Sequence, residues 1–129
     1  ESLVWYRIAR RYKSRFVNQV WRVVEYQGDG LTANFTQARR NSAPSSMLFY
    51  AEATALFLER RYPFLALLRN SSNYARYAFH AGLSLRAQAA RFPSKALWLL
   101  GVLPGLVAYL ADLKVRKPDT RAIERRTVR

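Results

Sequence analysis

The sequence ALWLLGVLPGLVAYLA, residues Ala96–Ala111, runs for sixteen positions without a charged residue. As an α-helix it covers ~24 Å of a hydrocarbon core that is ~30 Å thick. Lys95 precedes the run, and Asp112 and Lys114 follow it. The long lysine side chains extend the reach of the helix toward the headgroups. Trp98 and Tyr109 stand near the two ends, as aromatic residues do at a membrane interface. The pattern predicts a single transmembrane helix over residues 95–117, with a buried helix of a soluble protein as the alternative.

A G-x-x-x-G pattern, Gly101 to Gly105, lies within this run. Glycines four residues apart share one helix face, where the absent side chains let another helix approach to backbone contact. Pro104 lies between them and removes one backbone donor, which a membrane helix tolerates through local adjustment. We therefore expect Gly101 and Gly105 to be helix-packing residues, with the neighbouring helix supplied by another subunit.

Residues 1–26 are predicted to form one amphipathic basic helix that begins at Ser2. Apolar side chains recur every four residues, Trp5 and Trp21 widen the apolar stripe, and arginines run beside it. A basic helix with two tryptophans is typical of a helix that lies on a membrane surface. Packing on a partner protein is an equally good interpretation, and a leftover targeting peptide is a weaker one. A turn and a polar linker are expected over residues 27–46.

Residues 47–94 are expected to be a helical region with two further helices. The first, Met47–Arg61, opens with an apolar run of twelve residues, which is too short to span a bilayer. The polar run Asn70–Asn73 predicts a break, and the alanine-rich segment Tyr74–Arg91 predicts the second helix. Because the apolar residues are divided among separate amphipathic pieces, no autonomous globular core is expected.

Two titratable residues of this region suggest a functional role. Glu52 is the one charge in an apolar run, and we expect it to pair with an arginine of a neighbouring element rather than to relay protons. His80 is the one histidine of the chain, and we expect it to pack or to form hydrogen bonds. The chain has no cysteine and no phosphate-binding glycine loop. A metal site, a cofactor, a small-molecule substrate and an enzymatic function are therefore not expected.

Positive charge dominates the composition. Twenty-two lysines and arginines stand against eight acidic residues, which gives a formal net charge of +14. A compact monomer with this charge repels itself, so an anionic partner is expected. The cations gather where apolar runs end, which favours anionic lipid such as cardiolipin over nucleic acid. The expected lipid-contacting residues flank the predicted span: Arg86, Arg91, Lys95, Lys114, Arg116 and Lys117.

Residues 95–126 resemble subunit e of mitochondrial ATP synthase. The resemblance is carried by Ala96–Gly105 with its glycine pair, by Tyr109–Leu110 and by a charged segment that extends to Arg126. It implies a single span whose G-x-x-x-G packs against the corresponding motif of subunit g. Pro104 within the motif departs from the family pattern, and so do the 94 residues that precede the match.

These observations predict an all-α chain with a long N-terminal amphipathic helix, two further helices, one short transmembrane helix and a basic tail over residues 118–129. The expected function is that of a non-catalytic structural accessory subunit of a mitochondrial inner-membrane energy-transducing complex, in contact with its other subunits. The proton-transporting membrane region of ATP synthase is the first candidate. A supernumerary subunit of a respiratory-chain complex is the second, and a mitochondrial ribosomal protein that binds RNA is the alternative from a different class.

Overall fold

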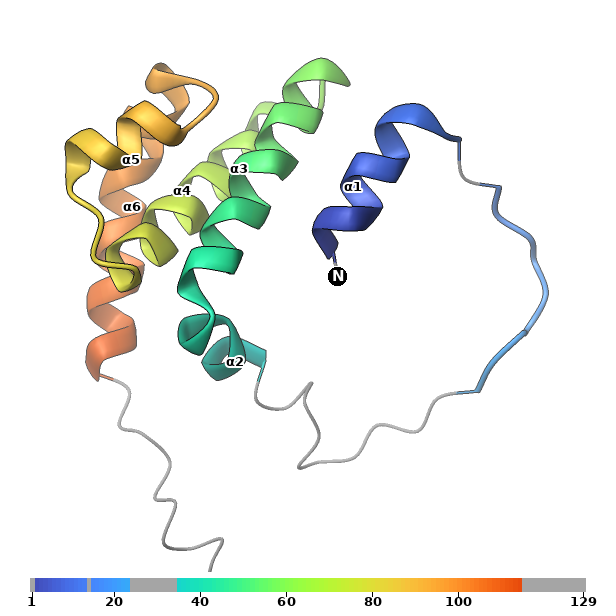
Figure 1. The fold of residues 1–129 in the computed structure, drawn as a ribbon, viewed down its shortest axis with the longest axis horizontal. Helices are drawn as coiled ribbons and strands as arrows, with labels where there is room; N and C mark the ends of the chain where they lie inside the picture. Colours follow the sequence, from blue (N-terminus) through green and yellow to red (C-terminus); the bar gives the residue numbers. More distant parts are fainter. Residues whose placement is uncertain (1, 14, 24–34, 115–129) are drawn as a thin grey trace, which may run out of the picture.

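The computed structural model describes residues 2–13, 15–23 and 35–114. Within these ranges the regular structure is entirely helical, which confirms the predicted all-α class (Figure 1). One of the helices, α6, is long and apolar enough to cross a membrane. The helices of the described residues are α1 (Ser2–Arg11), α2 (Phe35–Asn41), α3 (Ala43–Glu59), α4 (Phe64–His80), α5 (Leu85–Arg91) and α6 (Lys95–Lys114).

Helices α3 and α4 form an antiparallel hairpin. A turn at residues 60–63 joins them, and Pro63 immediately precedes the first residue of α4. The hairpin is held by aromatic contacts, since Tyr50 of α3 stacks on Tyr77 of α4 with 5.8 Å between the ring centroids. Because α4 also packs on α6, it is the central element of the fold (Figure 1).

Helices α4 and α6 run parallel to each other. Ser71 of α4 contacts Leu97 near the start of α6, and His80 contacts Asp112 near its end. Two consecutive parallel helices need a connection that returns the chain from the end of the first to the level at which the first began. The segment that contains α5 is this connection (Figure 1). The buried Tyr74 hydroxyl donates a hydrogen bond of 2.9 Å to the Gln88 carbonyl and so fixes α5 over α4.

A small apolar core lies among these helices, where the sequence analysis expected none. It draws on α3, α4, the residue that follows α5, and α6, and its buried members are Met47, Ala51, Leu67, Tyr74, Tyr77, Ala78, Phe92 and Leu97. Each helix contributes only a few apolar residues, so no single segment of the sequence reveals the core. The tyrosines fill the space that the neighbouring alanines leave.

The N-terminal helix is much shorter than predicted. It ends at Arg11, and the described part of residues 12–23 is not helical. This segment is rich in aromatic and β-branched residues, which lose side-chain freedom in a helix. Its apolar side chains are exposed, so no tertiary contact offsets that cost. Residues 24–26 of the predicted helix lie outside the described residues.

The predicted break at residues 70–73 is wrong, because these residues lie within α4. The side chains of Ser71, Ser72 and Asn73 bond to backbone carbonyls and therefore do not compete with the helix. Ser72 Oγ donates to the Leu68 carbonyl at 2.9 Å, and Asn73 Nδ2 donates to the Arg69 carbonyl at 3.0 Å.

The true break falls inside the segment that was predicted to be one helix over residues 74–91. α4 ends at His80, and Gly82 adopts a positive φ of 72°. The Gly82 and Leu83 amides donate to the Phe79 and Ala78 carbonyls, the two hydrogen bonds of a Schellman motif. Ser84 then caps α5, because its side chain accepts a hydrogen bond from the Ala87 amide.

Four helices, rather than the two expected, lie between α1 and α6 in the described residues. α2 and the first turn of α3 fall in the region predicted to be a polar linker, and Pro44 stands in that first turn, where its missing donor is not needed. Residues 27–34 of the linker, residues 115–117 of the predicted span and the tail at residues 118–129 lie outside the described residues.

Candidate functional site

The two glycines of α6 face α4 of the same chain. A Cβ added to Gly101 would lie 2.6 Å from the Ser71 Cβ, and one added to Gly105 would lie 2.6 Å from the Ser72 carbonyl oxygen. Only glycine permits so close an approach. The neighbouring helix is therefore α4, and not the helix of another subunit that the sequence analysis expected. Because residues 70–73 were predicted to be a break, Ser71 and Ser72, which make this contact, were not recognised as part of a helix.

A buried hydrogen bond reinforces the contact between α4 and α6. Ser71 Oγ donates to the Leu97 carbonyl at 2.6 Å, and Ser71 is completely buried. α6 continues through Pro104 to Lys114 without interruption. The glycine face of α6 is thus occupied along its length by α4, which leaves the opposite face for any other contact.

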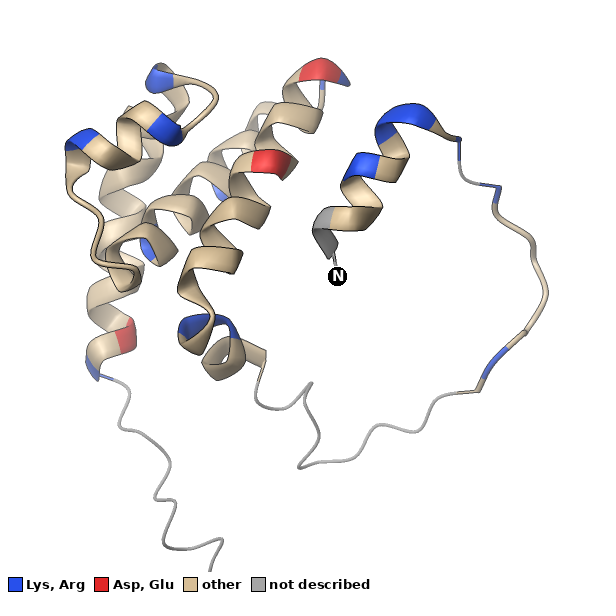
Figure 2. Cartoon of the chain, in the orientation of Figure 1, with Lys and Arg blue, Asp and Glu red and all other residues tan. Residues whose placement is uncertain are grey.

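That opposite face of α6 is apolar and exposed. Leu103, at the middle of the helix, has 69% of its surface exposed. No charged residue lies between Lys95 and Asp112, as Figure 2 shows. The other large apolar residues of α6 that are exposed are Leu99, Leu100, Val107, Leu110 and Leu113. Contiguous apolar surface of this kind marks contact with lipid or with another protein.

A buried carboxylate lies at the end of α6. Asp112 is only 7% exposed and accepts hydrogen bonds from three residues of two other helices. Arg76 binds both of its oxygens, through Nε at 2.6 Å and Nη2 at 2.5 Å. Arg40 Nη2 donates to Oδ1 at 2.5 Å, and His80 Nε2 donates to Oδ2 at 2.9 Å. We call these four residues the Asp112 cluster.

The Asp112 cluster joins three helices by electrostatic contacts. Arg40 comes from α2, Arg76 and His80 come from α4, and Asp112 comes from α6. The hydrogen bond from Arg76 to Asp112 raises the pKa of the guanidinium further, so Arg76 stays charged. The hydrogen-bonding role expected for His80 is confirmed. Both oxygens of the carboxylate are engaged, and the cluster holds α2, α4 and α6 together.

Asp112 and its two arginines were not among the site residues predicted from the sequence. Asp112 was seen only as a charge that ends the apolar run. The spacing of Asp112 could have indicated its role. Gly105 follows Gly101 by four residues and Asp112 follows Gly105 by seven, so all three residues share one helix face. A carboxylate on a helix-packing face predicts a buried ion pair. The identity of the arginines could not be predicted, because it depends on the parallel pairing of α4 with α6.

Helix α1 attaches to α3 through its arginines and through Tyr6, whose ring centroid lies 5.2 Å from that of Phe49. The arginines Arg7 and Arg10 pair with Glu52 at 3.4 Å each, which confirms the pairing expected for this carboxylate. Arg10 also reaches Glu59 at 3.5 Å. The apolar side of α1 consequently faces outward, and Trp5 is 64% exposed. The structure thus presents a second apolar surface in addition to α6.

The cations predicted to contact lipid lie at both ends of α6. Arg86, Arg91 and Lys95 are exposed on α5 and at the start of α6, and Lys114 is exposed at its end (Figure 2). Arg116 and Lys117 lie outside the described residues. The apolar face of α6 is therefore bounded by positive charge at each described end.

No group of three or more His, Asp or Glu side chains that could hold a metal ion occurs among the described residues. Comparison of the chain with models of protein families, with curated proteins and with solved structures found no match.

Proposed function

We propose that the chain is a non-catalytic structural subunit of a membrane complex, inserted or embedded through α6. The observation that carries this proposal is the division of α6 into two faces. One face packs on α4 through Gly101 and Gly105, and the other exposes leucines over the whole length of the helix. Exposed leucine surface is unfavourable in water, and lipid tails or another subunit would cover it.

The contacts of the charged residues support a structural role. Glu52 pairs with α1, and Asp112 is engaged by two arginines and a histidine. These carboxylates hold helices to one another, so they have no free oxygen for acid–base chemistry. An assembly factor or scaffold subunit fits this use of charge better than an enzyme does.

The host that we propose is an energy-transducing complex of the mitochondrial inner membrane. The high net positive charge and the basic ends of α6 suit a membrane rich in anionic lipid. The choice of ATP synthase as the host rests on the resemblance of residues 95–126 to subunit e. The respiratory-chain complexes are the alternative host. Because α4 occupies the glycine pair, a helix of another subunit would have to pack on the leucine face instead.

Alkaline carbonate extraction of the organelle membranes tests the membrane proposal. The native chain is expected in the pellet. Leu103→Asp puts a charge at the centre of α6, which costs about 3 kcal/mol in a membrane helix, so this variant is expected in the supernatant. Leu85→Asp is the matched control, because Leu85 is 53% exposed on α5 and outside the span.

Two outcomes of this extraction would contradict the proposal. Release of the native chain, together with cosedimentation with ribosomal RNA, would favour the RNA-binding alternative. Equal retention of both variants would show that α6 is not in contact with lipid. A native gel of detergent-solubilised membranes, followed by mass spectrometry of the band, identifies the host complex.

A further inference from the structure

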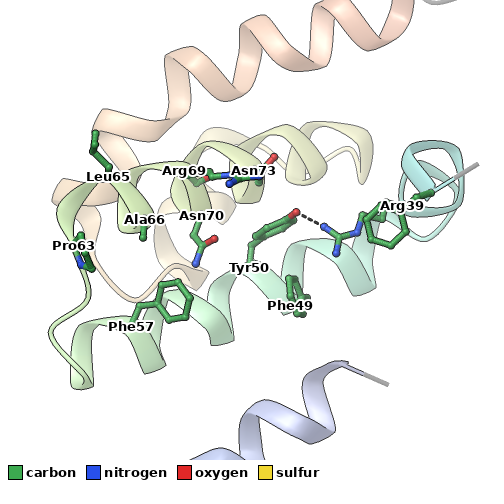
Figure 3. Close-up of a pocket in the computed structure, with 11 residues that line it drawn as sticks. Arg39, Phe49, Tyr50, Phe57, Pro63, Leu65, Ala66, Arg69, Asn70 and Asn73 are labelled. Atoms are coloured by element: carbon green, nitrogen blue, oxygen red, sulfur yellow. Dashed lines mark hydrogen bonds between the residues drawn. The ribbon is translucent and has the colours of Figure 1, made fainter. Parts of the chain in front are cut away.

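A groove of about 760 Å³ opens between α3 and α4, close to α2 (Figure 3). Its volume falls within the range of small-molecule and cofactor sites, roughly 300–1,000 Å³. The groove lies apart from the glycine contact and from the Asp112 cluster, because none of their residues lines it. It also lies apart from the cations that were predicted to contact lipid.

One part of the groove is lined by hydrogen-bond donors and positive charge. Arg39 of α2 and Arg69, Asn70 and Asn73 of α4 contribute these groups (Figure 3). No acidic residue is among the groove-lining residues that the structure describes. The three acidic side chains that form ion pairs in the described residues are directed elsewhere, toward α1 or into the Asp112 cluster. The groove therefore carries a positive charge that no carboxylate balances.

The Arg39 guanidinium is held in place without an acidic partner. It donates a hydrogen bond to the Tyr50 hydroxyl, and it lies 4.3 Å from the Phe35 ring centroid and 5.2 Å from that of Phe49. Aromatic contacts fix its position and leave its charge uncompensated. Fixed guanidinium groups are well suited to phosphate, which they bind through paired hydrogen bonds.

Asn70 provides a second, independent indication of a ligand. Its side-chain amide nitrogen is buried and has no hydrogen-bond acceptor. A buried donor without an acceptor has lost its hydrogen bonds to water and regained none, which costs free energy. Rotation of the amide toward an acceptor in the groove would recover this energy, and a phosphate oxygen is such an acceptor.

The other end of the groove is apolar. Phe57 of α3 and Pro63, Leu65 and Ala66 at the start of α4 line it, at the closed end of the hairpin (Figure 3). Leu65 is 75% exposed, so this end opens outward and does not enclose its occupant. A ligand that fills the groove must therefore be anionic at one end and apolar at the other.

We propose that this groove binds an anionic phospholipid. The phosphate lies between Arg39 and Arg69 with the two asparagine amides beside it, and one acyl chain runs along Phe57 toward Leu65. The inference rests on the proposed membrane location for the supply of lipid. The chemistry of the groove itself does not depend on that location.

The test uses the full chain, purified in a non-ionic detergent, with phosphatidylglycerol, phosphatidylcholine or inorganic phosphate added. Native mass spectrometry measures the fraction of the chain that retains each lipid. We expect phosphatidylglycerol to be retained at least about tenfold better than phosphatidylcholine, because both lipids carry the phosphate but the two uncompensated guanidinium groups repel the choline cation of phosphatidylcholine. Inorganic phosphate alone should bind weakly and displace little phosphatidylglycerol.

The variant Arg39→Gln/Arg69→Gln should lose this preference, about tenfold or more in affinity. The control Arg15→Gln/Arg22→Gln removes the same charge from exposed positions outside the helices and should change retention by less than about twofold. Circular dichroism checks that both variants keep their helix content. If the groove variant does not fold, Asn73→Asp adds a repelling charge at the rim, and Asn18→Asp is its exposed control.

Equal retention in the groove variant and its control would overturn the proposal. So would full displacement by inorganic phosphate, because the groove would then be an anion site without use for an acyl chain. Binding is measured in micelles, so it is independent of the result of carbonate extraction. A chain that binds phosphatidylglycerol in the groove but is released by carbonate would refute the membrane-embedded subunit and leave the lipid site standing.

Discussion

Asp112 is the residue on which the junction of α2, α4 and α6 depends. Its side chain is nearly fully buried and holds two arginines that are themselves largely buried. A carboxylate in this position compensates charges that would otherwise lack both water and a partner. It also fixes the register of α6 on α4, because Arg76 and His80 lie on consecutive turns of α4.

Replacing Asp112 by Asn should therefore destabilise the fold by about 3 kcal/mol, the cost of leaving a buried guanidinium without its partner. Thermal unfolding of the chain in detergent measures this loss. Glu59→Gln is the matched control, because the Glu59 side chain is 55% exposed where it meets Arg10 and such pairs contribute less than about 1 kcal/mol. Equal thermal stability of the two variants would contradict this prediction, because it would mean that water reaches the charged groups of the Asp112 cluster.

The glycines of α6 should not tolerate a larger side chain. The change Gly105→Leu should separate α6 from α4, because a Cβ at this position already lies 2.7 Å from the Ala75 Cβ and 3.0 Å from the Arg76 amide nitrogen. Overpacking of a tight contact costs roughly 1–3 kcal/mol, and Gly101→Leu should add to it. Leu103→Ile, on the opposite face, should cost much less.

Protease resistance in detergent, together with native-gel mobility, distinguishes two outcomes of the glycine change. Loss of protease resistance supports the contact with α4. A variant that keeps its protease resistance but leaves its complex would instead show that the glycine face binds another subunit. That result would restore the packing that the resemblance to subunit e implies.

The sequence predicted the bounds of α6 more accurately than those of α1. The apolar run and the flanking charges of α6 are local features, and the helix begins at Lys95 as predicted. The length of α1 depends on whether residues 12–23 find a partner, which periodicity does not reveal. The break at Gly82 was overlooked because the alanines on either side continue the helical pattern. Both errors concern the ends of helices, where tertiary contacts decide the outcome.

The candidate sites were predicted only in part, for a related reason. Gly101 and Gly105 could be identified as packing residues from their spacing, but the partner helix could not, because the serines of α4 were interpreted as a break. The groove between α3 and α4 was not predicted at all. Its residues come mainly from two helices, with Phe35 and Arg39 from a third, and they come together only when the hairpin forms.

The cations at the ends of α6 should bind anionic lipid. Changing Arg91 and Lys95 together to Gln should lower the cardiolipin content of the purified complex, because cations at a helix end attract anionic headgroups by about 1 kcal/mol each. Lipid mass spectrometry measures the content. The control is again Arg15→Gln/Arg22→Gln, and unchanged cardiolipin in the flank variant would count against these positions.

For the whole molecule, the exposed apolar surfaces of α1 and α6 determine how it behaves alone. The core among α3, α4 and α6 is small, and both surfaces need to be covered. We expect the isolated chain to aggregate without detergent, and to be helical and protease-resistant with it. A cooperative thermal transition of a detergent-free monomer, measured with sedimentation to confirm its size, would contradict this prediction.

High pH should unfold the chain through two buried tyrosines. Burial raises the pKa of Tyr74 and of Tyr77 above the ordinary value of about 10. The unfolded chain loses these protons first, so their contribution to stability is fully present below about pH 10 and falls as the pH rises through the raised pKa values. Denaturant titrations in detergent at increasing pH should show a smaller loss for Tyr74→Phe than for the native chain. Tyr12→Phe, at an exposed position, should follow the native chain.

The parallel pairing of α4 and α6 has an electrostatic consequence of its own. It sets two helix C-termini side by side, and each carries roughly half an elementary negative charge from its aligned peptide dipoles. In an antiparallel pair these partial charges would oppose one another, but here they add. The guanidinium groups of Arg40 and Arg76 meet at this end, and Arg40 Nη1 also donates to the Asp112 backbone carbonyl at 3.3 Å. The excess positive charge of the cluster is therefore matched by the backbone itself, and the two arginines neutralise the ends of two helices as well as one carboxylate.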